Sequence, residues 1–157
     1  MTHTPRRTFL KSGLALGLVS AAAAAGLLKP ARVLAAEWPK GAFESKKLEE
    51  AIQNLFGSAQ ATASGSIRIK APLQAENGAV VPIAVTADLP NVQSIALLVE
   101  KNAQPLIANV NLSGAEGYFS ARMKMNATSD VHVIVKSAGK LYSARQNIKV
   151  TVGGCGG

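Results

Sequence analysis

The chain of 157 residues has a formal net charge of +8, but most of the excess charge lies near its amino terminus. Residues 1–35 hold five Lys or Arg residues and no acidic ones. Subtracting these five from the total of 17 basic residues leaves 12 against 9 acidic residues, a formal charge of +3. Nucleic-acid binding would require basic residues clustered on one surface with aromatic stacking residues between them. The composition gives no support to that function class.

Residues 1–35 have the pattern of an export signal that is removed from the mature protein. Arg6 and Arg7 begin a charged start, which is followed by an apolar stretch over residues 13–28 and then by short side chains that suit a signal peptidase. The stretch is shorter than the roughly 20 residues of a membrane helix, so we expect no membrane segment in the mature form rather than a permanent anchor. The arginine pair resembles the twin-arginine signal, although Pro5 departs from its usual Ser or Thr, and predicts export of a folded protein to the periplasm.

Residues 36–65 are predicted to form an N-terminal helix and a linker. Between Ser45 and Phe56 the apolar residues recur at i, i+3, i+4 and i+7, which places them on one helical face: Leu48, Ala51, Ile52 and Leu55. Ser45 is a candidate amino-terminal cap, and Gly57 is well placed to end the helix. Residues 57–65 contain no large apolar side chain and are expected to form a loop.

Residues 66–152 change to a period of two, with turn residues about every ten positions. This pattern predicts a mainly β fold, an immunoglobulin-like antiparallel β-sandwich of about seven strands behind one short helix. Pro82 lacks an N–H group, so its strand should be at a sheet edge or bulged there. The sequence offers neither a strand Trp nor a cysteine pair of the antibody type. The expected strands are residues 66–70, 80–86, 92–100, 106–112, 118–125, 131–137 and 140–152.

Residues with catalytic or metal-binding chemistry are few in the predicted mature chain. His132, its one histidine, alternates with Val131 and Val133 and is expected on the solvent side of its strand. Zinc needs three or four ligands, which one His and one Cys do not supply. Glu49 and Glu50 are helix neighbours and point in different directions. We therefore predict no catalytic residue, no cofactor and no metal, and a protein that is not an enzyme.

The last five residues hold the one cysteine, Cys155, between Gly153, Gly154, Gly156 and Gly157. A single cysteine in an exported protein has no partner in its own chain, so it is free, paired with another molecule or covalently used. Gly-rich segments behave as flexible coil, so residues 153–157 are predicted to form a flexible arm that displays the thiol. The alternative is a frayed terminus with an incidental cysteine. No cation directly flanks the thiol, so we expect its activation to come from a partner's site.

Three stretches of the chain resemble SoxY, the carrier subunit of the bacterial Sox system for thiosulfate oxidation. They are the tail of residues 149–157 (KVTVGGCGG), residues 75–82 (AENGAVVP) and residues 122–125 (RMKM) before Thr128-Ser129. The resemblance implies a carrier that holds thiosulfate-derived sulfur covalently on Cys155.

The resemblance also implies a set of partners. SoxZ, a second immunoglobulin-like subunit, would form a heterodimer with the chain and be exported with it. A haem enzyme, SoxXA, would join thiosulfate to the thiol as an S-thiosulfonate, and SoxB, a dimanganese hydrolase, would release sulfate. A sulfur dehydrogenase would act in some organisms, and a disulfide-linked homodimer of the complex is a further implied state.

Two other functions fit parts of the sequence. A C-terminal Gly-Gly also resembles sulfur carriers that bear a thiocarboxylate, in which case Gly157 would hold the sulfur; those proteins have no export signal. The other is an exported structural or interaction module that dimerises through Cys155. The site of modification on the tail separates the three.

Overall fold

The computed structural model describes residues 38–151. The expected signal, residues 1–35 with Arg6 and Arg7, lies outside the described residues, as does the expected arm, residues 153–157. Within the described range no helix is long and apolar enough to cross a membrane. In chain order the elements are α2 (Lys40–Glu44), α3 (Leu48–Phe56), β1 (Thr62–Ala63), β2 (Ile67–Lys70), β3 (Gln74–Ala75), β4 (Val81–Ala87), β5 (Val92–Val99), β6 (Leu106–Asn111), β7 (Tyr118–Met123), β8 (Ser129–Ser137) and β9 (Lys140–Val150).

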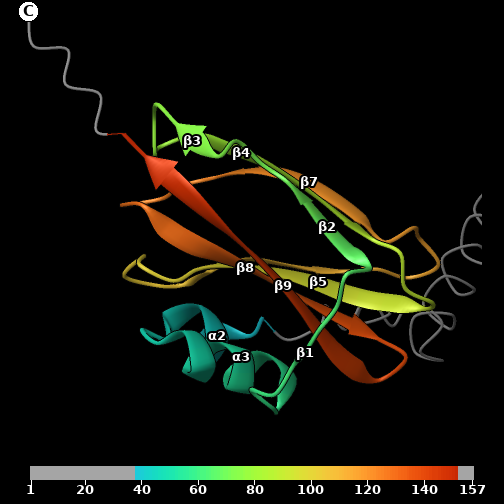
Figure 1. Cartoon of the computed structure of the whole chain (residues 1–157). Helices are drawn as coiled ribbons and strands as arrows, with labels where there is room; N and C mark the ends of the chain where they lie inside the picture. Colours follow the sequence, from blue (N-terminus) through green and yellow to red (C-terminus); the bar gives the residue numbers. More distant parts are fainter. Residues whose placement is uncertain (1–37, 152–157) are drawn as a thin grey trace, which may run out of the picture. The chain divides into compact units, whose positions relative to one another are not determined.

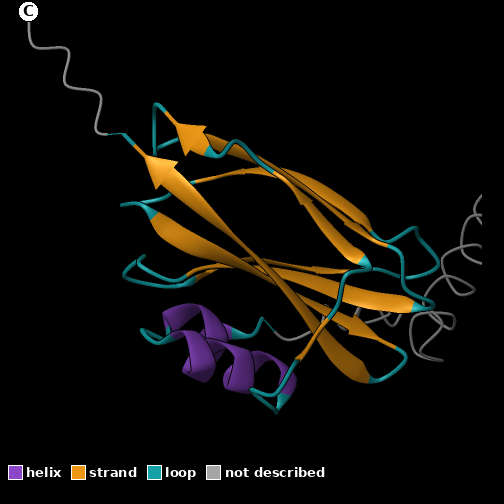
Figure 2. Cartoon of the chain, viewed as in Figure 1, coloured by secondary structure: helices purple, strands orange, loops and turns teal. Residues whose placement is uncertain are grey.

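The strands form two sheets that face each other (Figures 1 and 2). The larger sheet has the order β1-β9-β8-β5-β6, with β3 also paired to β9, and the smaller has the order β2-β4-β7. The seven longer strands pair antiparallel, whereas the two-residue strands β1 and β3 pair parallel with β9. The predicted mainly β sandwich is confirmed, and each of the seven expected runs contains a strand.

The main core lies between the sheets and follows the period-two pattern of the sequence. Alternate residues of β4, β5 and β8 point inward and are fully or almost fully buried: Val81, Ile83, Val85, Ile95, Leu97, Val99, Val131, Val133 and Val135. Met123 and Ile148 complete this layer. The sandwich is therefore held by apolar burial, the dominant favourable term in folding.

A second apolar cluster lies on the outer face of the larger sheet, where α2 and α3 cover it (Figure 1). Ala96 and Leu98 of β5 and Ile134 of β8 point away from the main core and pack with Ala51 and Ile52 of α3. Because β5 is buried on both faces, its sequence is a nearly continuous apolar run instead of an alternating one.

The helix predicted from Ser45 to Phe56 is present as α3, which begins three residues later at Leu48, and a second short helix, α2, precedes it. The Ser45 hydroxyl donates to the Gly41 carbonyl oxygen at 2.8 Å at the end of α2, so Ser45 does not cap α3. Residue Lys47 precedes α3 and makes no side-chain cap hydrogen bond. The predicted stop is confirmed: Gly57 adopts φ of 77°, and its N–H donates to the Gln53 carbonyl at 2.8 Å.

Pro82 lies in β4, the middle strand of the smaller sheet, at a point where only one neighbour is paired. It stands opposite Arg122 of β7, whereas the pairing with β2 ends at Ala84 and Lys70. The strand is therefore not an edge strand as expected, but Pro82 lies beyond the residues of β4 that pair with β2, where a missing N–H is tolerated. The expected loop over residues 57–65 contains β1, which the sequence pattern did not indicate.

Leu97→Ala should lower the free energy of unfolding by about 2–5 kcal/mol, because Leu97 is completely buried at the centre of the main core. Leu73→Ala is the matched control, since the Leu73 side chain is 76% exposed. Urea unfolding of both variants measures the difference. Equal stability losses would contradict the assignment of the core.

Candidate functional site

Lys149, Val150 and Thr151 are the last described residues before Cys155, and we call them the root of the tail. Cys155 and the glycines Gly153, Gly154, Gly156 and Gly157 lie outside the described residues. The site is therefore built here from the end of β9 and the segments beside it. Figure 1 places this root at the end of the sandwich where β9, β3 and the start of β4 meet.

The end of β9 is fixed on two sides by hydrogen bonds. On one side the Lys149 N–H donates to the Leu73 carbonyl at 2.9 Å, and the Thr151 N–H and hydroxyl donate to the Ala75 carbonyl at 3.0 and 3.2 Å. On the other side the Val150 N–H donates to Thr128 Oγ1 at 2.9 Å. The chain is thus held at a defined point four residues before the cysteine.

A groove of about 530 Å³ opens beside this root, and Val150 and Thr151 form part of its wall. One side comes from the loop between β3 and β4, and the other from the end of β7 and the residues after it. Lys124 and Glu76 are its charged groups, and both side chains are exposed. The complete lining is Glu76, Asn77, Gly78, Ala79, Lys124, Met125, Asn126, Val150 and Thr151.

Gly78 lets the two sides of the groove meet. A Cβ atom there would collide with the Met125 carbonyl oxygen and lie 2.8 Å from Val150 Cγ1. The Met125 N–H donates to the Gly78 carbonyl oxygen at 2.7 Å, which joins the two sides. Asn77 shapes the turn, since its side-chain oxygen accepts from the Ala79 N–H at 2.8 Å.

Asn102 connects the groove to the loop that follows β5. Its side-chain nitrogen donates to the Lys124 carbonyl at 2.8 Å, and its side-chain oxygen accepts from the Asn126 N–H at 3.0 Å. The strand pattern gave no indication of this residue's role, because both bonds join segments more than twenty residues apart. Asn102 holds one wall of the groove in place.

His132 is not alone on its strand. Its side chain is only 18% exposed, and Nε2 lies 3.4 Å from Glu100 Oε2. The side chain does alternate with buried Val131 and Val133, but Glu100 and Asp130 surround it on the outer face of the larger sheet. His132 thus points away from the buried Val131 and Val133, as expected, but it is partly covered and has two carboxylates beside it. Glu49 and Glu50 are exposed in the first turn of α3, as expected.

Comparison with known proteins identifies the family. The model of the family described as "Sulfur oxidation protein SoxY" matches residues 52–155, more than half of the chain. The chain belongs to the SoxY family. The match extends from α3 through both sides of the groove to the position of Cys155, so one family pattern includes the root and the cysteine of the tail.

A solved SoxY structure gives the same result. The sulfur carrier protein SoxY from Chlorobium limicola f thiosulfatophilum is 38% identical over 72% of this chain and 99% of that chain, with a TM-score of 0.62. Superoxide reductase (neelaredoxin) from Ignicoccus hospitalis is 19% identical with a TM-score of 0.49, and the match covers 55% of this chain and 80% of that chain. No match was found among curated proteins. The SoxY family and its solved member support a sulfur-carrier role.

The SoxY resemblance of the two internal stretches has a structural counterpart at the groove. Residues 76–79 of the first stretch form one wall, and Lys124 and Met125 of the second form the other. These stretches are more than forty positions apart in the sequence, yet they meet beside the root of the cysteine tail. The features that resemble SoxY therefore concentrate at one end of the sandwich.

Proposed function

We propose that the mature protein is a periplasmic sulfur carrier that holds thiosulfate-derived intermediates covalently on Cys155. The observation that carries this proposal is the position of the chain's single cysteine within the SoxY family match, four residues after the root of the tail. The twin-arginine pattern of Arg6 and Arg7 supports export. SoxZ is the proposed heterodimer partner.

The proposed cycle needs chemistry from other proteins. A haem enzyme of the SoxXA type would form a sulfur–sulfur bond between Cys155 and thiosulfate, taking two electrons and releasing the thiol proton. A dimanganese hydrolase of the SoxB type would add water to the terminal sulfone, releasing sulfate and leaving a persulfide on the cysteine. A sulfur dehydrogenase would oxidise that remaining sulfur. The carrier supplies the attachment atom and a surface that the enzymes approach.

The root groove is the part of this proposal that the described residues define. Each enzyme must reach a sulfur atom on a tail whose last described residue, Thr151, lies beside Gly78 and Lys124. The walls of the groove are therefore positioned to contact any protein that takes up the tail. Their shape depends on the close approach at Gly78.

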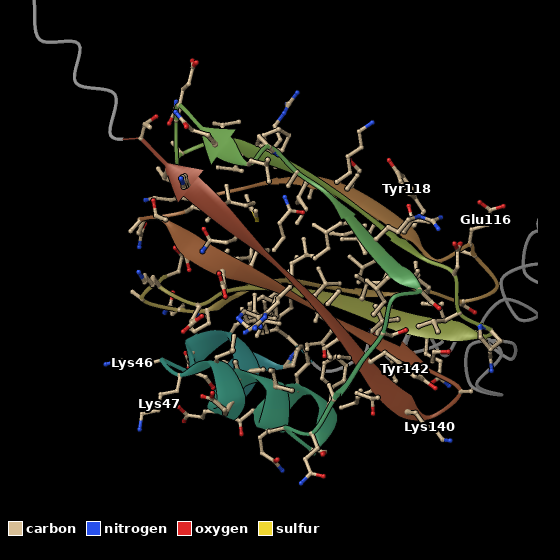
Figure 3. The ribbon with its side chains drawn as sticks, in the orientation of Figure 1. Lys46, Lys47, Glu116, Tyr118, Lys140 and Tyr142 are labelled. Carbon is tan, nitrogen blue, oxygen red and sulfur yellow. The ribbon has the colours of Figure 1, made fainter. Side chains whose placement is uncertain are left out.

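Gly78→Ala is expected to lower the free energy of unfolding by about 1–3 kcal/mol through the collision with Met125 and Val150. It should also slow sulfate formation by reconstituted partners at a temperature where the variant stays folded. Gly117→Ala is the matched control, because its Cβ would collide with the Ala87 carbonyl oxygen. Figure 3 places its neighbours Glu116 and Tyr118 at the end of the sandwich away from the tail.

A comparison of the two variants separates a local role from general destabilisation. We expect similar melting temperatures but a slower rate only for Gly78→Ala. Equal rates for the two variants would remove the root groove from the proposal. The assignment of Cys155 would stand, because that residue has its own test.

Intact-mass analysis of the protein from cells grown on thiosulfate tests the function itself. Sulfur or thiosulfate adducts on the Cys155 peptide are the expected result. Modification at Gly157 would support a thiocarboxylate carrier instead. A disulfide dimer as the sole modified form would support an exported interaction module.

A further inference from the structure

Three side chains with metal-ligand chemistry meet on the outer face of the larger sheet. Glu100 follows the end of β5, and Asp130 and His132 lie on β8. One ligand atom from each residue lies within 4.8 Å of the others. The His132 Nε2 to Glu100 Oε2 distance is 3.4 Å.

The sheet positions these residues through its register. Asp130 and His132 are two residues apart on one strand, so both side chains are on the same face. Val99 pairs with Val131, which brings Glu100 next to Asp130, and the Glu100 N–H donates to the Asp130 carbonyl at 3.1 Å. The three ligands thus come from two paired strands and not from separate loops.

The spacing is close to that of a coordination sphere. Two ligand atoms that are each about 2.0–2.1 Å from a tetrahedral zinc ion are about 3.4 Å from each other. The His132–Glu100 separation equals that value, and the Asp130 ligand atom lies within 4.8 Å of both. Asn147 donates to Asp130 Oδ1 at 2.6 Å, which orients the carboxylate as an outer-shell partner would.

The charge of the cluster also favours a cation. Within residues 38–151, His132 is the single ion-pair partner of Glu100, and Asp130 has no ion pair. Arg145 of β9 stands opposite His132 in the register but makes no ion pair with either carboxylate. The two carboxylates together carry a formal charge of −2, and among the described residues no Lys or Arg forms an ion pair with either of them.

We propose that Glu100, Asp130 and His132 bind a divalent first-row transition metal ion, with water completing its coordination. The imidazole nitrogen favours zinc, copper or nickel over magnesium and calcium, which prefer all-oxygen sites. Zinc suits a site of one nitrogen and two carboxylate oxygens. This metal site is separate from the sulfur chemistry of Cys155.

A metal bound to Glu100 would restrain the loop after β5, because Glu100 is the first residue of that loop. Asn102 in the same loop holds Lys124 and Asn126 of the root groove. The proposed ion therefore lies at the same end of the sandwich as the tail. A bound metal would stabilise that end without contacting the substrate.

Zinc titration of the untagged mature chain carrying Cys155→Ser tests the site, since a thiolate would bind zinc by itself. Calorimetry should detect one Zn²⁺ per chain and no heat with Mg²⁺. His132→Gln, and separately Glu100→Gln, should weaken zinc binding at least about 10-fold, and Asn147→Leu by about 10-fold. Asp88→Asn is the control, because Asp88 pairs with Arg68 elsewhere on the surface.

Histidine NMR provides a second readout. The chain has two histidines, His3 and His132, and the first lies within the expected signal, so the mature protein should give one imidazole spin system. We expect its signals to shift on addition of one equivalent of Zn²⁺. Unshifted signals, or zinc affinity that is unchanged in His132→Gln while circular dichroism shows a folded variant, would overturn the proposal.

Discussion

Cys155→Ser should abolish sulfate formation from thiosulfate by the reconstituted partner proteins, while the protein remains folded. The substitution replaces the sulfur that is proposed to form the sulfur–sulfur bond with an oxygen that does not form it. Both apolar clusters are complete among residues 38–151, so we expect the melting temperature to stay within about 2 °C, less than the effect of 1 kcal/mol in a domain of this size. Sulfate release measures the first effect and thermal unfolding the second.

A relocated thiol is the control for this result. Ser113 is exposed in the loop between β6 and β7, so Cys155→Ser combined with Ser113→Cys restores a free thiol at a different place. This double variant should remain inactive, because the partners are proposed to recognise the sulfur on its glycine tail. Sulfate formation at the original rate by either variant would show that Cys155 is not the carrier residue.

Gly154→Val should slow sulfate formation by on the order of tenfold or more, because a misplaced reacting atom loses much of its rate. Valine restricts φ and ψ and adds two methyl groups next to the cysteine. The tail would then be wider and less able to enter each partner's site. Steady-state sulfate release measures the rate, and the melting temperature should not change.

Gly65→Val is the control for the valine itself. A Cβ at Gly65 meets no atom within 4 Å, and this residue precedes β2, away from the tail. The control should form sulfate at the original rate. A normal rate for Gly154→Val would remove the glycine tail from the mechanism while leaving Cys155 as the attachment point.

The β-sandwich could be predicted from the sequence because its strands alternate locally. Val81, Ile83 and Val85 mark the inward face of β4, and Val131, Val133 and Val135 mark that of β8. Strands β1 and β3 have only two residues each, too few to show a period. Their parallel pairing with β9 depends on tertiary contacts that no local pattern contains.

The helical region shows how short elements lose a sequence signal. The apolar face of α3 was predictable from Leu48, Ala51 and Ile52, and its end from Gly57. Helix α2 has only five residues, and the hydroxyl of Ser45, which directly follows it, donates to the Gly41 carbonyl four residues back. A good capping residue therefore closes the preceding helix instead of starting the next one.

The cysteine could be identified from the sequence, but its surroundings could not. The groove joins Gly78, Met125 and Val150, which are brought together by three different strands and loops. In the same way, the sequence did not indicate that Glu100 lies beside His132, because the two residues are 32 positions apart. Both clusters depend on strand register, which a single sequence does not specify.

A small domain is enough for the proposed carrier role. The sandwich holds the start of the tail through the bonds of Lys149, Val150 and Thr151, and it offers a groove beside that point. Partner enzymes would supply the oxidation and hydrolysis. The tasks that we propose for this chain are attachment and presentation of the sulfur.

Mass spectrometry of the C-terminal peptide during a reconstituted reaction tests the central claim most directly. Cleavage after Lys149, the last lysine, releases residues 150–157 with the cysteine. We expect a thiosulfonate on Cys155 after thiosulfate and the haem enzyme are added, and its conversion to a persulfide as the hydrolase releases an equal amount of sulfate. Sulfate produced at the full rate while this peptide stays unmodified would contradict the account.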